Sequence, residues 1–226
     1  MRKVQHGSEA DARGAMEAIC RGYWYPIYAF ARSSGLVVED AEDLTQLFFQ
    51  DMITHESLRR AREDKGRLRT FMLAMLKRIL SKHRRHESAG KRGGGRDATF
   101  SFDDEAAEER YRREPVDLND PERMFDRAWA EGVLMAASDK LRAECAGAED
   151  VETFDQLAEF LPLGDNATPY AEAAARLRIE QGTLRLQIHR MRKRYGKLIE
   201  GEIAQTVHDA AELKTELAHL MAAMGR

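Results

Sequence analysis

Residues Thr168 to Lys197 read TPYAEAAARLRIEQGTLRLQIHRMRKRYGK, and this stretch predicts a helix-turn-helix. Thr168 is a favourable N-cap, and Pro169 suits the first position of a helix. The small side chains of Ala173 and Ala174 would let a second helix approach closely. A short connection over residues 178–181 would then lead into that second helix, which we expect from about residue 182 onward.

The second helix carries an apolar stripe at helical spacing, formed by Leu184, Ile188, Met191, Tyr195 and Leu198. We expect this stripe to face the core. The residues at the start of the helix or away from the stripe would then be available to DNA, and they are Gln181, Thr183, Arg185, Leu186, His189, Arg190 and Lys193. Between residues 176 and 197 eight basic side chains accompany one acidic side chain, a balance that attracts phosphates. A solvated amphipathic helix pair without a ligand is the simpler alternative.

The chain as a whole is slightly acidic, with a formal net charge of −3, so it is not a simple basic DNA-binding module. Its charge is segregated instead. Residues 59–96 contain fourteen basic and three acidic side chains, whereas residues 39–51 and 97–120 are rich in acidic side chains. Segregation of this kind allows a nucleic-acid surface within an acidic protein.

The composition favours an all-α fold, because strand patterns are scarce and helix-favouring residues dominate the periodic segments. The 226 residues are enough for two small helical domains. We expect the first domain over residues 1–96, a flexible acidic linker over residues 97–120, and the second domain over residues 121–226. A last amphipathic helix, with Leu213, Leu217 and Leu220, would cap the second domain.

Several classes of protein are disfavoured by the sequence. The N-terminus lacks the apolar run of a signal peptide, and the longest apolar run is too short to cross a bilayer. Cys20 and Cys145 lack metal-ligand spacing, and no catalytic constellation emerges from the scattered histidines. We therefore predict a cytoplasmic protein without membrane insertion, metal, cofactor or enzymatic activity.

The order of the motifs indicates a family. DAEDLTQLFF at residues 40–49 precedes the basic segment, and YAEAAARLRIEQGTLRLQIHRMRKRY follows at residues 170–195. This arrangement resembles the bacterial RNA polymerase sigma factors of the extracytoplasmic-function (ECF) type, in the sigma-70 family, over most of the chain. The resemblance implies that residues 1–96 are sigma domain two, which binds core polymerase and the minus-ten promoter element. Residues 121–226 would be sigma domain four, whose helix-turn-helix binds the minus-thirty-five element.

The resemblance also implies partners and site residues. The partners are core RNA polymerase through its β and β′ subunits, promoter DNA, and an anti-sigma factor as a candidate regulator. Core polymerase would be bound by Asp43, Leu44, Gln46 and Phe49. In domain two, promoter DNA would be bound by Arg67, Arg69, Thr70, Lys77 and Arg78. The chain departs from the family pattern at Leu47, at Arg78, and at Arg178, which replaces a glycine common in the turn of the motif.

Two alternatives come from other functional classes. A helix-turn-helix transcription regulator that never joins polymerase would use the same DNA-binding residues, but it would have no need of the motif at residues 40–49. A nucleic-acid-processing enzyme would need an acidic metal cluster or a nucleophile beside the basic segment, and the sequence offers neither.

Overall fold

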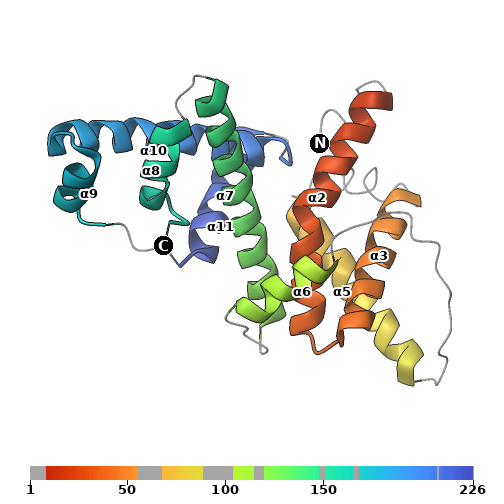
Figure 1. Cartoon of the computed structure of the whole chain (residues 1–226). Helices are drawn as coiled ribbons and strands as arrows, with labels where there is room; N and C mark the ends of the chain where they lie inside the picture. The colour runs from red at the N-terminus through yellow and green to blue at the C-terminus, as the bar shows by residue number, and fades with distance from the viewer. Residues whose placement is uncertain are drawn as a thin grey trace. The chain divides into compact units, whose positions relative to one another are not determined.

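The structure is a computed structural model that describes residues 9–54, 68–88, 104–114, 120–147, 151–164, 168–207 and 209–225. Over these residues it contains helices and no strand, which confirms the all-α prediction. Figure 1 shows the helices, whose bounds are α2 Glu9–Ser33, α3 Val38–Thr54, α5 Leu68–Ser88, α6 Asp104–Arg113, α7 Pro121–Gly147, α8 Val151–Leu157, the 3-10 helix η1 Ala158–Phe160, α9 Tyr170–Leu177, α10 Gln181–Ala204 and α11 Ala210–Ala223. None of the helices in the described ranges is long and apolar enough to span a membrane.

The chain divides into two compact units whose bounds differ from the expected domains. Unit 1 comprises Met1–Ala130 together with Thr206–Arg226, and unit 2 comprises Glu131–Gln205. Helix α7 therefore begins in unit 1 and ends in unit 2. The C-terminal helix α11 belongs to unit 1, whereas the sequence predicted that it would cap the second domain.

Unit 1 has an aromatic core built on α2, α3 and α5. Residues 23–31 of α2 are all buried, and the Trp24 ring stacks on Phe49 of α3 with their centroids 5.6 Å apart. The edge of Phe48 meets the same Phe49 ring at 5.4 Å. Helix α5 contributes its buried stripe of Leu68, Met72, Met75 and Leu76. Each large apolar side chain that is fully buried stabilises the fold by about 1.5–3 kcal/mol, so these three helices form a stable base.

Helix α6 corrects the prediction of a flexible linker. Residues 104–113 form a helix that packs on α2, where Glu108 accepts hydrogen bonds from the Tyr28 hydroxyl at 2.6 Å and from Arg32 Nε at 2.9 Å. The Arg32 guanidinium also lies over the Tyr111 ring, 5.1 Å from its centroid. Acidic composition alone predicted an unpacked segment. In the structure, Arg32, 76 positions earlier in the sequence, neutralises the charge of Glu108, and Tyr28, 80 positions earlier, donates a hydrogen bond to it.

Unit 2 contains the second part of α7 together with α8, η1, α9 and α10. Leu134 and Leu141 of α7 and Phe154 of α8 are buried, as are Ile199 and Ile203 of α10. The buried Tyr195 hydroxyl of α10 donates a hydrogen bond to the Leu134 carbonyl at 2.8 Å. The middle and the end of α10 thus have buried residues in unit 2, and its first turns pack against α9.

Candidate nucleic-acid interface

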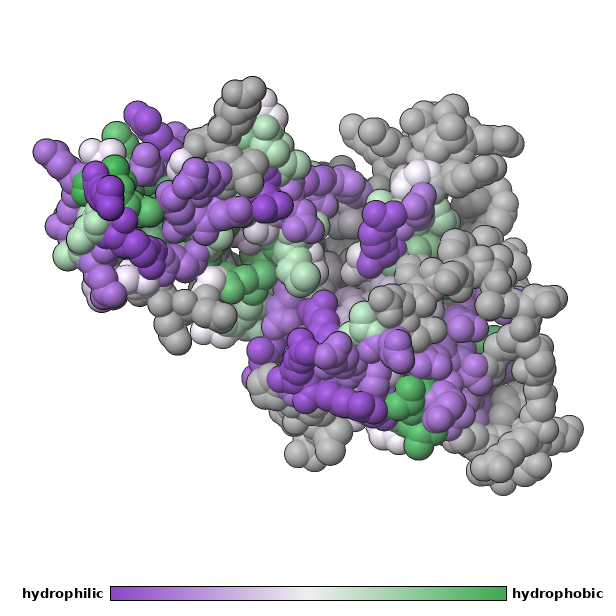
Figure 2. All heavy atoms as spheres, in the orientation of Figure 1, coloured by the Kyte–Doolittle hydropathy of each residue, from purple (hydrophilic) through white to green (hydrophobic). Residues whose placement is uncertain are grey.

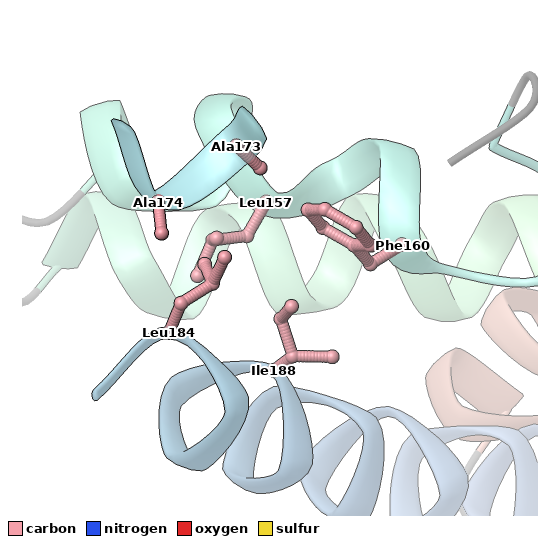
Figure 3. Close-up of a cluster of buried hydrophobic side chains, with 6 residues drawn as sticks. All are labelled: Leu157, Phe160, Ala173, Ala174, Leu184 and Ile188. Atoms are coloured by element: carbon pink, nitrogen blue, oxygen red, sulfur yellow. The ribbon is translucent and has the colours of Figure 1, made fainter. Parts of the chain in front are cut away.

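A small core holds the helix-turn-helix together. Side chains from α8, η1, α9 and α10 converge in it (Figure 3), and its buried members are Leu157, Phe160, Ala173, Ala174, Leu184 and Ile188. The two alanines allow α10 to lie close to α9, as predicted. The predicted apolar stripe of α10 is confirmed for Leu184, Ile188 and Tyr195, which are buried, and Met191 and Leu198 are partly buried.

The turn between the two helices is a Schellman motif. The Arg178 N–H donates to the Ala175 carbonyl at 3.2 Å, and the Ile179 N–H donates to the Ala174 carbonyl at 3.1 Å. This closure requires a left-handed backbone at Arg178, where φ is 55° and ψ is 39°. Glycine adopts that conformation without strain, whereas arginine does not. Arg178 therefore keeps the geometry of a turn that glycine would form and adds local strain.

The start of α9 differs from the prediction. Thr168 was expected to cap the helix, but the N-cap position belongs to Pro169, and no side chain caps it. The Thr168 hydroxyl and N–H both donate to Glu159 Oε2, at 2.6 and 3.0 Å. Arg176 of α9 pairs with the other oxygen of Glu159. Glu159 therefore fixes α9 to η1, and these hydrogen bonds lower the pKa of Glu159 to about 2.

A glycine makes the position of Glu159 possible. A Cβ atom on Gly164 would lie 2.2 Å from the backbone oxygen of Glu159, so no other residue fits at this point of the loop. The loop returns the chain toward α9 with the Gly164 N–H donating to the Leu161 carbonyl at 2.9 Å. The loop therefore packs at Gly164 against the backbone of Glu159, the residue that binds α9.

The side chains predicted to read DNA from unit 2 are all exposed. They lie at the start of α10 or away from its buried stripe, and we call them the α10 face: Gln181, Thr183, Arg185, Leu186, His189, Arg190 and Lys193. Figure 2 shows mainly hydrophilic side chains over α9 and α10. Leu186 is the large apolar member and is 48% exposed. An exposed leucine within a polar face is suited to apolar contact with a thymine methyl group.

The basic residues around α10 differ in whether they form hydrogen bonds or ion pairs within the chain. Arg194 forms a paired contact with Glu144, Arg176 pairs with Glu159, and Arg192 donates to the Phe160 carbonyl at 2.9 Å. Within the part of the chain that the structure describes, neither Arg190 nor Lys193 has an acidic partner. These two side chains keep their full charge available to an anionic ligand.

Arg185 is positioned by an aromatic pair. Its guanidinium lies over the Tyr170 ring, 6.0 Å from the centroid. The Tyr170 ring in turn meets the buried Phe160 edge-on, with their centroids 5.3 Å apart. The contact with Phe160 fixes the tyrosine, and a cation–π contact at this distance orients the arginine weakly.

The predicted polymerase-binding residues of α3 fall on two sides of the helix. Leu44 and Phe49 are 0% and 1% exposed and belong to the core of unit 1, so their side chains are not offered to a partner. Asp43 and Gln46 are partly exposed, and the neighbouring Leu47 is exposed. The described surface of α3 that remains for a partner is therefore mainly acidic and polar, with Leu47 as an exposed apolar side chain.

The predicted DNA-binding residues of unit 1 are only partly available. Arg67 lies outside the described residues. Thr70, Lys77 and Arg78 are exposed on α5, where Lys77 pairs with Glu122 at 2.5 Å and Arg78 with Asp51 at 3.6 Å. Arg69 is 5% exposed and forms no part of this surface.

Arg69 is instead the centre of a buried charge network. Its Nε donates to Glu216 of α11 at 3.0 Å, its Nη1 donates to Asp126 of α7 at 2.5 Å, and its guanidinium lies 5.3 Å from the Trp129 ring centroid. Burial lowers the pKa of Arg69, but the hydrogen bond that Arg69 donates to Glu216 and the charge of Asp126 outweigh this effect and raise the pKa above its ordinary value. Asp126, Trp129 and Glu216 were not predicted as functional residues.

The α10 face combines exposed basic and polar side chains with the exposed Leu186. In the described ranges no group of three histidine, cysteine or acidic side chains is arranged to hold a metal ion. No protein-family model matches the chain, and neither does any curated protein or solved structure.

Proposed function

We propose that the chain is a sigma factor, which binds core RNA polymerase and directs it to promoters. Unit 2 would bind the upstream promoter element, and unit 1 would hold the polymerase and contact DNA near the start of melting. The observation that supports the proposal best is the helix-turn-helix, whose apolar stripe is buried while the whole α10 face is exposed.

The α10 face has the dimensions that reading DNA requires. Its residues extend from Gln181 to Lys193, which is about 18 Å of helix at 1.5 Å per residue. The major groove is about 12 Å wide and admits one helix. Arg185 offers a guanidinium that can pair with the two acceptors of guanine, whereas Arg190 and Lys193 offer charge to phosphates.

The polymerase contact rests on the surface of α3. Asp43 and Gln46 are partly exposed there, and Leu47 adds a 37% exposed apolar side chain among acidic neighbours. An acidic surface of this kind complements a basic helix of a partner. Leu44 and Phe49 support the surface from inside the core and are not included in the proposed contact.

A regulator that binds DNA without polymerase is the second candidate. It is favoured by the burial of Leu44, Phe49 and Arg69, which leaves unit 1 with fewer of the contacts that a sigma factor would use. In that case α10 would act in the same way, but α3 would have no polymerase partner.

One experiment separates the two candidates. The chain is mixed with core polymerase and a random DNA library, and the polymerase-bound DNA is recovered and sequenced. A sigma factor co-purifies with polymerase and enriches a common DNA motif, and Asp43→Arg reduces both. Enrichment by the chain alone, with no retention on core polymerase, would favour the regulator. If no motif is enriched either with core polymerase or with the chain alone, the DNA-binding function is rejected.

A further inference from the structure

The attachment of α11 to unit 1 buries few side chains completely. Of the residues Ala210–Ala223, Glu216 and Leu220 are the buried ones. Leu220 contributes a single large apolar side chain, and the contribution of a buried ion pair is small because desolvation opposes the attraction between the charges. Helix α11 is therefore a candidate for an element that leaves its site when a competing anion arrives.

The Arg69 site contains one more negative charge than positive charge. Asp126 holds Nη1 at 2.5 Å, Glu216 holds Nε at 3.0 Å, and the face of the guanidinium lies against Trp129. Because Asp126 and Trp129 are both on α7, they would keep Arg69 oriented after α11 departs. Glu216 is the exchangeable carboxylate, since its helix can move away without disturbing the other two contacts.

A guanidinium binds a phosphate with the same planar geometry that it uses for a carboxylate. We propose that Arg69 is a phosphodiester-binding residue whose site is occupied in the free chain by Glu216, so that α11 opposes DNA binding by unit 1 until DNA displaces it. This inference rests on the proposed function and adds to it a regulatory element contained in the chain itself.

A purely structural role for Glu216 predicts the opposite effect of mutation. If the ion pair only anchors α11, Glu216→Gln weakens unit 1 and leaves DNA binding unchanged or weaker. If Glu216 competes with phosphate, the same substitution strengthens DNA binding, because the amide keeps the shape of the side chain and loses its charge. The direction of the change in affinity therefore distinguishes the two roles.

The first measurement is the affinity of the full chain for a short fluorescein-labelled duplex of random sequence, over a range of salt concentrations. Glu216→Gln should bind about fivefold more tightly than the unmodified chain, a typical size for coupling between two sites. Its salt dependence should be steeper by roughly one unit, because one more phosphate is neutralised. In an Arg69→Ala background, Glu216→Gln should have no effect.

Glu105→Gln is the matched control, since it removes an exposed negative charge from α6 of the same unit. It should change the affinity by less than about twofold, as expected for an exposed charge. Equal or weaker DNA binding by Glu216→Gln, with a normal circular dichroism spectrum, would overturn the inference while leaving the proposed function intact. Failure of the unmodified chain and every variant to bind DNA, both alone and with core polymerase added, would instead overturn the proposed function and the inference with it.

A second measurement uses the unmodified chain and does not depend on the folding of a variant. Hydrogen exchange followed by mass spectrometry should show faster exchange in residues 210–223 when the duplex is added, because displaced α11 loses its contacts with unit 1. Unchanged or slower exchange in that segment at saturating DNA would mean that α11 stays in place, and the competition between Glu216 and phosphate would be wrong.

Discussion

Glu159→Gln should loosen the helix-turn-helix of unit 2 in a pH-dependent manner. The Glu159 carboxylate accepts hydrogen bonds from the Thr168 hydroxyl at 2.6 Å and the Thr168 N–H at 3.0 Å, and it also pairs with Arg176. The amide oxygen of glutamine can accept both bonds from Thr168, but the amide has no charge and no second acceptor oxygen for Arg176. The start of α9 would then be held less firmly against η1.

The magnitude follows from the pKa of Glu159. The Thr168 side chain, the Thr168 N–H and Arg176 lower it from 4.5 to about 2. Taken at full value, this shift corresponds to about 3 kcal/mol at 1.36 kcal/mol per pKa unit. The side chain is 22% exposed, so solvent screening reduces the effect, and we expect about 1–2 kcal/mol.

The sign of the pH dependence is fixed by the direction of the shift. Because the pKa is lower in the folded chain than in the unfolded chain, the stabilisation is fully present above pH 4.5. It decreases as the pH falls below 4.5 and is lost below about 2, where the carboxylate is protonated in both states. The stability difference between the unmodified chain and Glu159→Gln should therefore be largest near neutral pH and should shrink in acid.

Hydrogen exchange of unit 2 is the suitable assay, because both tryptophans, Trp24 and Trp129, lie in unit 1 and their fluorescence would not report on α9. Protection of residues 170–177 is compared at pH 7 and at about pH 3.5, after correction for the intrinsic pH dependence of amide exchange. Glu152→Gln, in an exposed position of α8, is the control. An equal deficit at both pH values would show that the charge of Glu159 does not act as described.

Three further predictions test the two units separately. Arg185→Ala should relax the sequence preference of the bound DNA, since a good arginine–guanine pair discriminates between bases by about 1–3 kcal/mol. Lys193→Ala should weaken binding to all sequences alike, and parallel selections from a random library measure both effects. Arg178→Gly should stabilise unit 2 by about 0.5–1 kcal/mol, measured by urea unfolding, because glycine relieves the left-handed backbone. Asp43→Arg should weaken retention on core polymerase without loss of helicity, whereas Leu44→Ala should destabilise unit 1 by about 2–5 kcal/mol through a cavity.

The sequence predicted the helix-turn-helix well because the relevant information is local. The spacing of Leu184, Ile188 and Tyr195 determines which side of α10 is buried, and the α10 face then follows by rotation along the helix. The alanines at 173 and 174 pack as their size predicts. Each of these inferences needs only the period of a helix and the preference of apolar side chains for the interior.

Contacts between distant residues were not predictable in the same way. The sequence assigned Thr168 to a local capping role, but its hydroxyl donates to a carboxylate nine positions earlier. Glu216 carried a usable signal, because it lies three positions after Leu213 and four before Leu220, on the apolar side of its helix. An acidic residue in such a position requires a buried partner. The pattern gives no means of identifying that partner as Arg69, which is 147 positions away.

Arg69 also shows why counting charges overestimates a DNA-binding surface. The excess of basic residues in 59–96 predicted strong attraction to phosphates, yet Arg69, Lys77 and Arg78 each have a carboxylate partner in unit 1. In the described residues of unit 2, Arg190 and Lys193 have none. A basic residue contributes to attraction only to the extent that its charge is not already compensated nearby. Under the proposed function, α10 would therefore supply most of the salt-dependent affinity of the free chain, and unit 1 would contribute when its carboxylates are displaced.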